Sequence, residues 1–184
     1  MAIAFQAASS TMAPSSAGEV TVTNTLSRTA ATNFIVAYGG GRFGGATAIT
    51  YDSVAMTQAV LENSSDSTSA AGPFVGIGMY YMFSSDLPVS TGTYTLSATF
   101  PTTGEHMAVV AGIALSGVEQ TTAGHVIAQV SQTATSSTTL SVSITSNEAD
   151  SWIIIGTYAR NSTVDVGLVV GAEQTVRVDL RDIA

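Results

Sequence analysis

Residues 38–45, YGGGRFGG, decide between two fold classes. Their glycines spell the G-x-G-x-x-G pattern with which a strand–turn–helix unit holds a dinucleotide at the helix N-terminus. A short apolar strand at residues 33–38 precedes them, but residues 46–51 are β-prone and lack a helical apolar period. No lysine follows the glycines, so they do not fit a phosphate-binding P-loop either. We therefore interpret YGGGRFGG as a loop between two strands.

Short runs of alternating or β-branched apolar residues recur along the chain, divided by clusters of Gly, Pro, Asn, Asp and Ser. Residues 93–100 alternate most clearly. Residues 107–115 and 152–158 are apolar on both faces, which is typical of strands covered on both sides. A hairpin is expected around Asp52 and Ser53. The remaining expected strands are 19–26, 34–38, 46–51, 54–61, 74–83, 126–130, 140–145, 164–170 and 175–180.

These segments amount to about ten to twelve strands, and the gaps between them are too short for crossover helices. The pattern predicts an all-β fold: a single antiparallel two-sheet β-sandwich, jelly-roll-like, at residues 19–184. Residues 7–18 show no core-forming pattern. We expect residues 1–18 to form an extended N-terminal arm that is held against a partner.

The composition excludes some partners. The 184 residues carry a net charge of −8 with five basic residues, all of them arginine, so nucleic acid and anionic membranes are disfavoured as direct partners. Charged residues are only 10% of the chain while hydrophobic residues are 45%. Such a neutral surface favours burial by other subunits, as in a homo-oligomer. The alternative is that Ser and Thr hydroxyls solvate the faces of a monomer.

No catalytic motif emerges, and we expect a protein that is not an enzyme and needs no cofactor. His106 and His125 lie 19 residues apart without a metal-binding spacing, so ordinary loop positions are expected for both. Ser116 lacks the glycines of a nucleophile elbow, and nothing in the spacing favours a triad with His125 and Asp150.

Acidic residues in two polar loops could hold a calcium ion, although neither loop has the spacing of an EF-hand. Plain polar turns are the alternative, and we expect no metal site. The acids concerned are Glu62, Asp66, Glu148 and Asp150.

Candidate partner contacts occur in two places. Arg42 and Phe43 lie at the tip of the glycine loop, and both residue types are enriched in interaction hot spots. In the last expected strand, Arg177, Asp179 and Arg181 share one face with alternating charge. That face is either a polar contact strip or a solvated surface with weak neighbouring ion pairs.

Aromatic residues gather in one expected strand, where Tyr81 and Phe83 share a face and Tyr80 points the opposite way. Core packing is the default role for such side chains. A row of exposed tyrosines would instead suit stacking against sugars.

Three stretches, ITYDSVAMTQAV (49–60), GIGMYYMFSSDLPVSTGTYTLSATF (76–100) and VVAGIALSGVEQTT (109–122), carry a resemblance. Within residues 34–158 the chain resembles a β-sandwich module of virus and phage structural proteins and of bacterial surface proteins. The resemblance implies a jelly-roll-like sandwich used for structure or attachment.

The function that we expect is that of a phage structural protein, a capsid decoration or cement subunit on the virion surface. Its partners would be copies of itself and a major capsid protein. The alternative is a tail-fibre or cell-surface attachment module that binds glycans.

Overall fold

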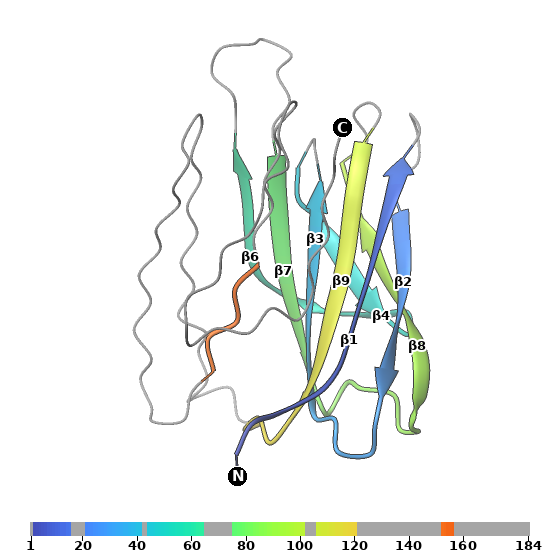
Figure 1. The fold of residues 1–184 in the computed structure, drawn as a ribbon, viewed down its shortest axis with the longest axis vertical. Helices are drawn as coiled ribbons and strands as arrows, with labels where there is room; N and C mark the ends of the chain where they lie inside the picture. The colour runs from blue at the N-terminus through green and yellow to red at the C-terminus, as the bar shows by residue number, and fades with distance from the viewer. Residues whose placement is uncertain are drawn as a thin grey trace.

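A computed structural model of the protein describes residues 2–15, 21–41, 44–64, 75–101, 106–120 and 152–156. Within these ranges the chain forms nine strands and no helix (Figure 1). The strands are β1 (Ala4–Ser15), β2 (Thr21–Arg28), β3 (Phe34–Gly41), β4 (Ala48–Tyr51), β5 (Val54–Ala55), β6 (Thr57–Ser64), β7 (Val75–Phe83), β8 (Gly92–Thr99) and β9 (His106–Ser116).

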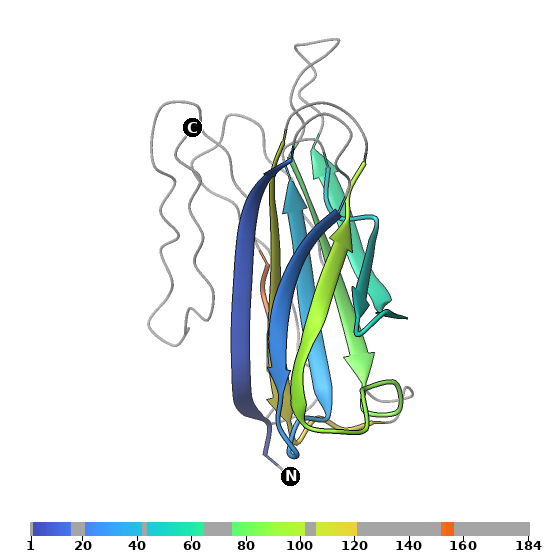
Figure 2. The same cartoon turned by 90° about the vertical axis from the view of Figure 1, so that its right-hand side faces the viewer.

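The strands make two sheets that pack face to face (Figure 2). The larger sheet has the order β1-β9-β3-β7-β6, the smaller one has the order β2-β8-β4-β5, and every pairing is antiparallel. The expected all-β antiparallel sandwich is therefore confirmed. The expected strands at 126–130, 140–145, 164–170 and 175–180 lie outside the described residues.

The pairing is nested from the outside inward: β1 with β9, β2 with β8, β3 with β7, and β4 with β5. This is a long hairpin folded over on itself, which is the connectivity of a jelly roll. Its tip is the hairpin that the sequence predicted around Asp52 and Ser53. The φ angles of these two residues, 51° and 67°, match a type I′ turn. After Met56 the chain crosses to the larger sheet as β6.

The N-terminal segment is extended, but it is not an arm outside the sandwich. Residues 4–15 form β1, which pairs along its length with β9. Sequence reasoning missed this strand because its core-facing side chains are small, and Ala7 and Ala13 give no strong apolar alternation. Residues 152–156, expected within a strand, carry none in the described part of the chain.

The core lies between the sheets and is built from the alternate residues that the sequence pattern selects. Leu96 and Ala98 of β8 and Ile35 of β3 are fully buried there. Burying a large apolar side chain of this kind stabilises the fold by about 1.5–3 kcal/mol. The core tyrosines keep their hydroxyls paired, because Tyr51 donates to the Leu26 carbonyl at 3.0 Å and Tyr80 to the Ala46 carbonyl at 2.8 Å.

The glycines of YGGGRFGG serve a close backbone contact. Gly39–Gly41 end β3, opposite Gly78 and Gly76 of β7. The chain then doubles back, so that the amide of Ala46 donates to the Gly39 carbonyl at 3.0 Å. A Cβ on Gly45 would lie 2.5 Å from the Gly78 nitrogen, and one on Gly78 would lie 2.5 Å from the Ala46 oxygen. No helix follows, so the dinucleotide interpretation has no structural basis here.

Candidate functional site

The two outer faces of the sandwich differ in chemistry. The outer face of the smaller sheet is covered by hydroxyls, because Ser and Thr alternate with core residues along β2 and β8. They pair across the strands, and the Ser27 and Thr93 oxygens are 3.0 Å apart. We call this surface the hydroxyl face. Its cross-strand pairs are Thr21–Thr99, Thr23–Ser97, Thr25–Thr95 and Ser27–Thr93.

The outer face of the larger sheet is apolar. A second hydrophobic cluster lies there, on the side of β3 and β9 that points away from the core. We call it the apolar face. Its buried members are Phe34, Val36, Tyr38, Ala111, Ile113 and Leu115, and its half-buried margin includes Phe5, Ala8, Ile77, Met79, Tyr81 and Phe83.

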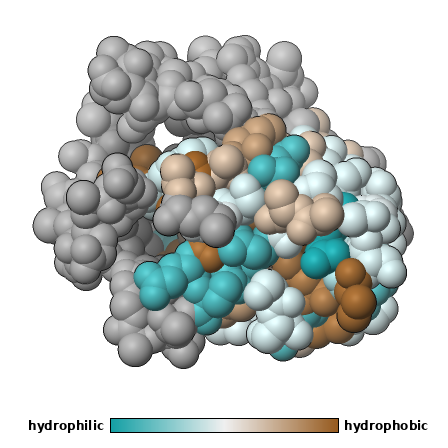
Figure 3. All heavy atoms as spheres, turned by 90° about the horizontal axis from the view of Figure 1, so that it is seen from below, coloured by the Kyte–Doolittle hydropathy of each residue, from teal (hydrophilic) through white to brown (hydrophobic). Residues whose placement is uncertain are grey.

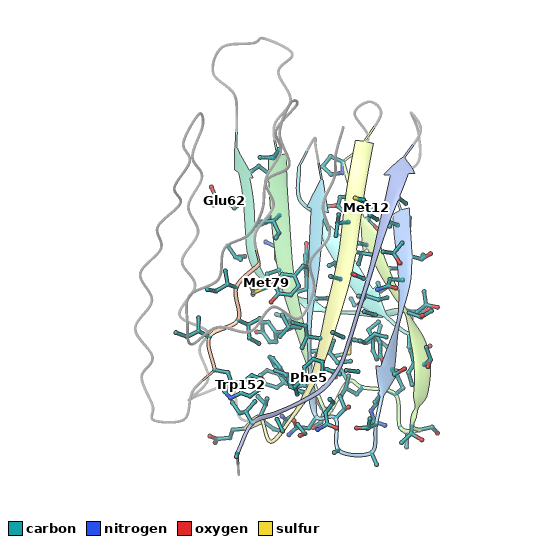
Figure 4. The ribbon with its side chains drawn as sticks, viewed as in Figure 1. Phe5, Met12, Glu62, Met79 and Trp152 are labelled. Carbon is teal, nitrogen blue, oxygen red and sulfur yellow. The ribbon has the colours of Figure 1, made fainter. Side chains whose placement is uncertain are left out.

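Side chains on this face span the length of the sheet (Figure 4). Phe5 and Met12 mark two heights along β1, and Met79 lies on β7. Glu62 of β6 lies at the margin, opposite Ile77. Of the charged residues that the structure describes, Glu62 is the one placed on this face. The apolar face therefore has little electrostatic patterning of its own.

An aromatic cluster occupies one end of the apolar face. The Phe34 ring stacks on Tyr81 at 6.0 Å between centroids and meets Phe83 at 5.3 Å. Tyr81 and Phe83 meet edge to face at 5.4 Å. As the sequence predicted, Tyr81 and Phe83 share a face and Tyr80 points the opposite way, which in the structure is into the core. Because the three rings pack on one another, they do not form a row of open stacking surfaces.

Residues 152–156 lie over part of the apolar face. Ile154 packs into the cluster, and Gly156 sits so close to Tyr38 that a Cβ there would overlap the ring. The neighbouring side chains turn outward: Trp152 is 43% exposed, Ile153 52% and Ile155 61%. Large apolar groups are thus exposed in one short segment, which is a feature of interaction sites.

Tyr38 places a buried polar group, its hydroxyl, on this apolar face. Its ring is buried between the sheet and Gly156, and among the described residues its hydroxyl has no hydrogen-bond partner. Burial raises the pKa of Tyr38 far above its usual range, because the phenolate would lose its hydration. An unpaired buried hydroxyl costs stability of about 1–3 kcal/mol.

The end of the sandwich near the N-terminus mixes hydrophilic and hydrophobic patches (Figure 3). Its loops are held by polar contacts. The Arg28 guanidinium donates to the Val89 and Ser90 carbonyls at 3.1 and 2.9 Å. Asn33 donates to the Val118 carbonyl at 2.7 Å and accepts from the Val118 amide. These groups stabilise loops and leave no arrangement suited to catalysis among them.

The candidate contact residues Arg42, Phe43, Arg177, Asp179 and Arg181 all lie outside the described residues, as do His125, Asp66, Glu148 and Asp150.

Two of the residues considered for catalysis or metal binding, His106 and Ser116, lie within the described residues. His106 is the first residue of β9. The Ser116 hydroxyl accepts a hydrogen bond from the Gln6 amide at 2.9 Å, which ties β9 to β1. Within the described ranges no group of three metal-binding side chains occurs. No helix in those ranges has the length and apolar character needed to cross a membrane.

Sequence reasoning did not single out the apolar face as a site. The signal was present, since residues 107–115 are apolar on both faces and Phe34, Val36 and Tyr38 alternate with core residues. That pattern correctly predicted a strand covered on both sides, because residues 110–115 of β9 are all buried. It did not predict that one side would be the outer face of a sandwich.

No protein-family model matches the chain. Comparison with curated proteins and with solved structures finds no match either.

Proposed function

We propose that the protein is a phage structural protein, a capsid decoration or cement subunit that acts through protein–protein contacts on the virion surface. The observation that carries the proposal is the contrast between the two outer faces. The hydroxyl face suits water, whereas the segment 152–156, which lies over the apolar face, exposes the large apolar side chains of Trp152, Ile153 and Ile155. A partner that covers the apolar face would remove these side chains from water and stabilise the assembly.

Charge fits this role. The described apolar face has one carboxylate at its margin, and the whole chain has a net charge of −8. A negative subunit stays away from packaged DNA, and an uncharged contact surface meets a capsid protein without desolvating ions. The partner in this proposal is a major capsid protein with an apolar surface strip, together with copies of the chain itself.

The fold adds weaker support. Nested antiparallel pairing of the jelly-roll type is common in viral capsid proteins, but lectins and cupins share it. Fold alone does not define function. The proposal therefore rests on the apolar face, with the resemblance to phage structural modules as a second line.

The direct test is density-gradient separation of the native source followed by mass spectrometry. The proposal predicts that the chain travels at high copy number with DNA-filled particles. Low copy number on particles would favour a tail position. A chain that stays soluble or bound to cells would refute the virion role.

A pair of variants tests which face binds. Ile155→Lys places a charge on the exposed segment that lies over the apolar face, and Thr23→Lys places the same charge on the exposed hydroxyl face. Ile155→Lys should weaken rebinding of the purified chain to particles by at least about tenfold, which corresponds to 1.4 kcal/mol. Thr23→Lys should leave rebinding unchanged, and both variants should keep the melting temperature.

The second candidate function is glycan binding by an attachment module. The partly exposed Trp152 favours it, because sugars stack on accessible aromatic rings. Titration of oligosaccharides against Trp152 fluorescence, with Trp152→Ala as the control, distinguishes the two functions. Saturable quenching by a defined sugar would support the attachment role.

A further inference from the structure

The described strands end in four sheet edges, and three of them carry features that discourage pairing with another chain. The edge strand β6 carries Glu62 and a register shift between Gln58 and Val60. The edge strand β5 has only two residues. The edge strand β2 ends in Arg28 and runs beside β1 (Figure 2). Charge, bulges and short length are the usual protections of a sheet edge.

The fourth edge, β1, also runs beside β2, but its register shift between Phe5 and Ala7 and its Pro14 lie at the two ends of residues 7–13 and leave that stretch regular. It is twelve residues long and contains no charged residue. Within the described ranges, backbone hydrogen bonds of residues 7–13 run to β9 only, which leaves the opposite edge of this stretch without a strand partner. Unpaired N–H and C=O groups in a row are a template for strand addition.

The strand is held in place for such pairing. Asn24 of β2 accepts a hydrogen bond from Thr11 at 3.0 Å and donates one to Ser9 at 2.9 Å. These bonds fix β1 against the neighbouring sheet through its core-facing side chains. A fixed edge loses little conformational entropy when it pairs, which favours association.

We propose that the occupant of this edge is a second copy of the chain, paired antiparallel to β1 about a twofold axis at Ser10. The usable stretch is symmetric around that residue: a register shift lies between Phe5 and Ala7, and Pro14, which lacks an N–H, follows Ala13. Residues 7–13 between these limits form an uninterrupted ladder with β9.

The side chains agree with this register. Ser10 meets Ser10 and Ala8 meets Met12. Their side chains are on the outer side of the sheet, because Ser10 and Ala8 pair with Ala111 and Ile113 of the apolar face and Met12 lies two residues after Ser10. On the core side, Ser9 meets Thr11 and Ala7 meets Ala13. No like charges meet, and each contact is repeated by symmetry, as an isologous interface requires. The two apolar faces then become continuous across the axis.

The test uses the purified full-length chain and no particles, so its result is independent of the proposed virion role. The chain contains no cysteine. Ser10→Cys would place two thiols directly opposite each other, at the Cα separation of about 4.5–5.5 Å that cross-strand partners have and disulfides accept. Mild oxidation should convert most of this variant to a disulfide-linked dimer. The matched control Ser85→Cys, in an exposed turn, should give only traces.

Sedimentation over a concentration series provides the second readout. The wild type should reach twice the mass of a single chain. Ser10→Lys, which sets two like charges on the axis, should raise the dimer Kd by about tenfold. Ser85→Lys, with the same change in net charge, should leave the Kd unchanged.

A wild type that stays monomeric at every concentration would overturn the proposal, and so would a dimer that Ser10→Lys leaves intact. Cross-linking of Ser10→Cys no greater than that of Ser85→Cys, or cross-linking to a different protein instead, would also overturn it. If circular dichroism shows that Ser10→Lys is unfolded, the comparison of disulfide cross-linking between Ser10→Cys and Ser85→Cys tests the proposal.

Discussion

At the scale of single residues, three buried tyrosines differ in whether their hydroxyls form hydrogen bonds. Tyr51 and Tyr80 donate to backbone carbonyls inside the sandwich. Tyr38 lies beneath Gly156 on the apolar face, and the structure shows no partner for its hydroxyl among the described residues. The same side-chain type therefore stabilises the core in two places and carries a cost in the third.

The first prediction follows from this difference. Tyr38→Phe removes an unpaired buried hydroxyl and should raise the free energy of unfolding by about 1–3 kcal/mol. Tyr80→Phe, the matched control, loses a hydrogen bond at 2.8 Å and leaves the Ala46 carbonyl unpaired, so it should lower stability by about 0.5–1.5 kcal/mol. Urea unfolding of both variants measures this. A loss of stability in Tyr38→Phe equal to that in Tyr80→Phe would contradict the account.

The second prediction concerns alkaline pH. Burial raises the pKa of Tyr51 to about 12, with smaller contributions from Tyr94 and Asp52 that raise it and from Arg28 that lowers it. Unfolded tyrosine titrates near about 10. Between these values the unfolded chain releases a proton that the folded chain keeps, so stability falls as pH rises. The slope is about 1.4 kcal/mol per pH unit for each such tyrosine.

Below pH about 10 the tyrosines should make stability independent of pH, since both states hold the proton. Unfolding by urea at pH 9 to 12 measures the profile as an order-of-magnitude test. Tyr51→Phe should fall less steeply with pH than the wild type. Identical slopes for the two proteins would show that Tyr51 keeps an ordinary pKa in the folded state.

At the scale of elements, the glycine stretch sets how β3 and β7 meet the returning chain. Gly78→Ala would push a methyl group against the Ala46 carbonyl, where backbone cannot move cheaply, and should destabilise the fold by about 1–3 kcal/mol. Gly92→Ala is the control, because its added Cβ would meet only the Tyr94 ring at an ordinary 3.5 Å. Thermal melting compares them. Equal melting temperatures would show that the close approach of Gly78 to the Ala46 carbonyl does not require a glycine.

Much of this element pattern could be predicted from the sequence. Alternation located β2 and β8 within a few residues, because the core side of each strand bears large apolar side chains. The strand β7 was located instead by its continuous run of apolar and aromatic residues. The turn at Asp52 and Ser53 followed from local turn chemistry.

β1 was missed for a physical reason. It reaches the core with Ala7 and Ala13 and with hydroxyls that pair across the sheets through Asn24, so its stability comes from backbone pairing with β9. Pairing between residues about a hundred positions apart leaves no local signal. The apolar face was also unpredictable, because a doubly apolar strand does not reveal which of its sides lies between the sheets.

At the scale of the whole molecule, the jelly-roll-like sandwich has one outer face of exposed hydroxyls and one apolar outer face, over which segment 152–156 exposes large apolar side chains. The proposed assembly uses the apolar face for a capsid partner and the edge of β1 for a second copy. Both contacts lie on the larger sheet, so a dimer through β1 would double the apolar surface offered to the partner. The hydroxyl face would remain toward solvent.

The measurement that tests this account most directly is hydroxyl-radical footprinting of the chain in its native assembly and after isolation. Oxidation of Trp152 and Met79 reports on the apolar face, and Val89, which is 98% exposed, reports on the loops at one end. The account predicts that Trp152 and Met79 lose labelling several-fold in the assembly while Val89 keeps its labelling. Equal labelling of Trp152 and Met79 in both states would contradict it.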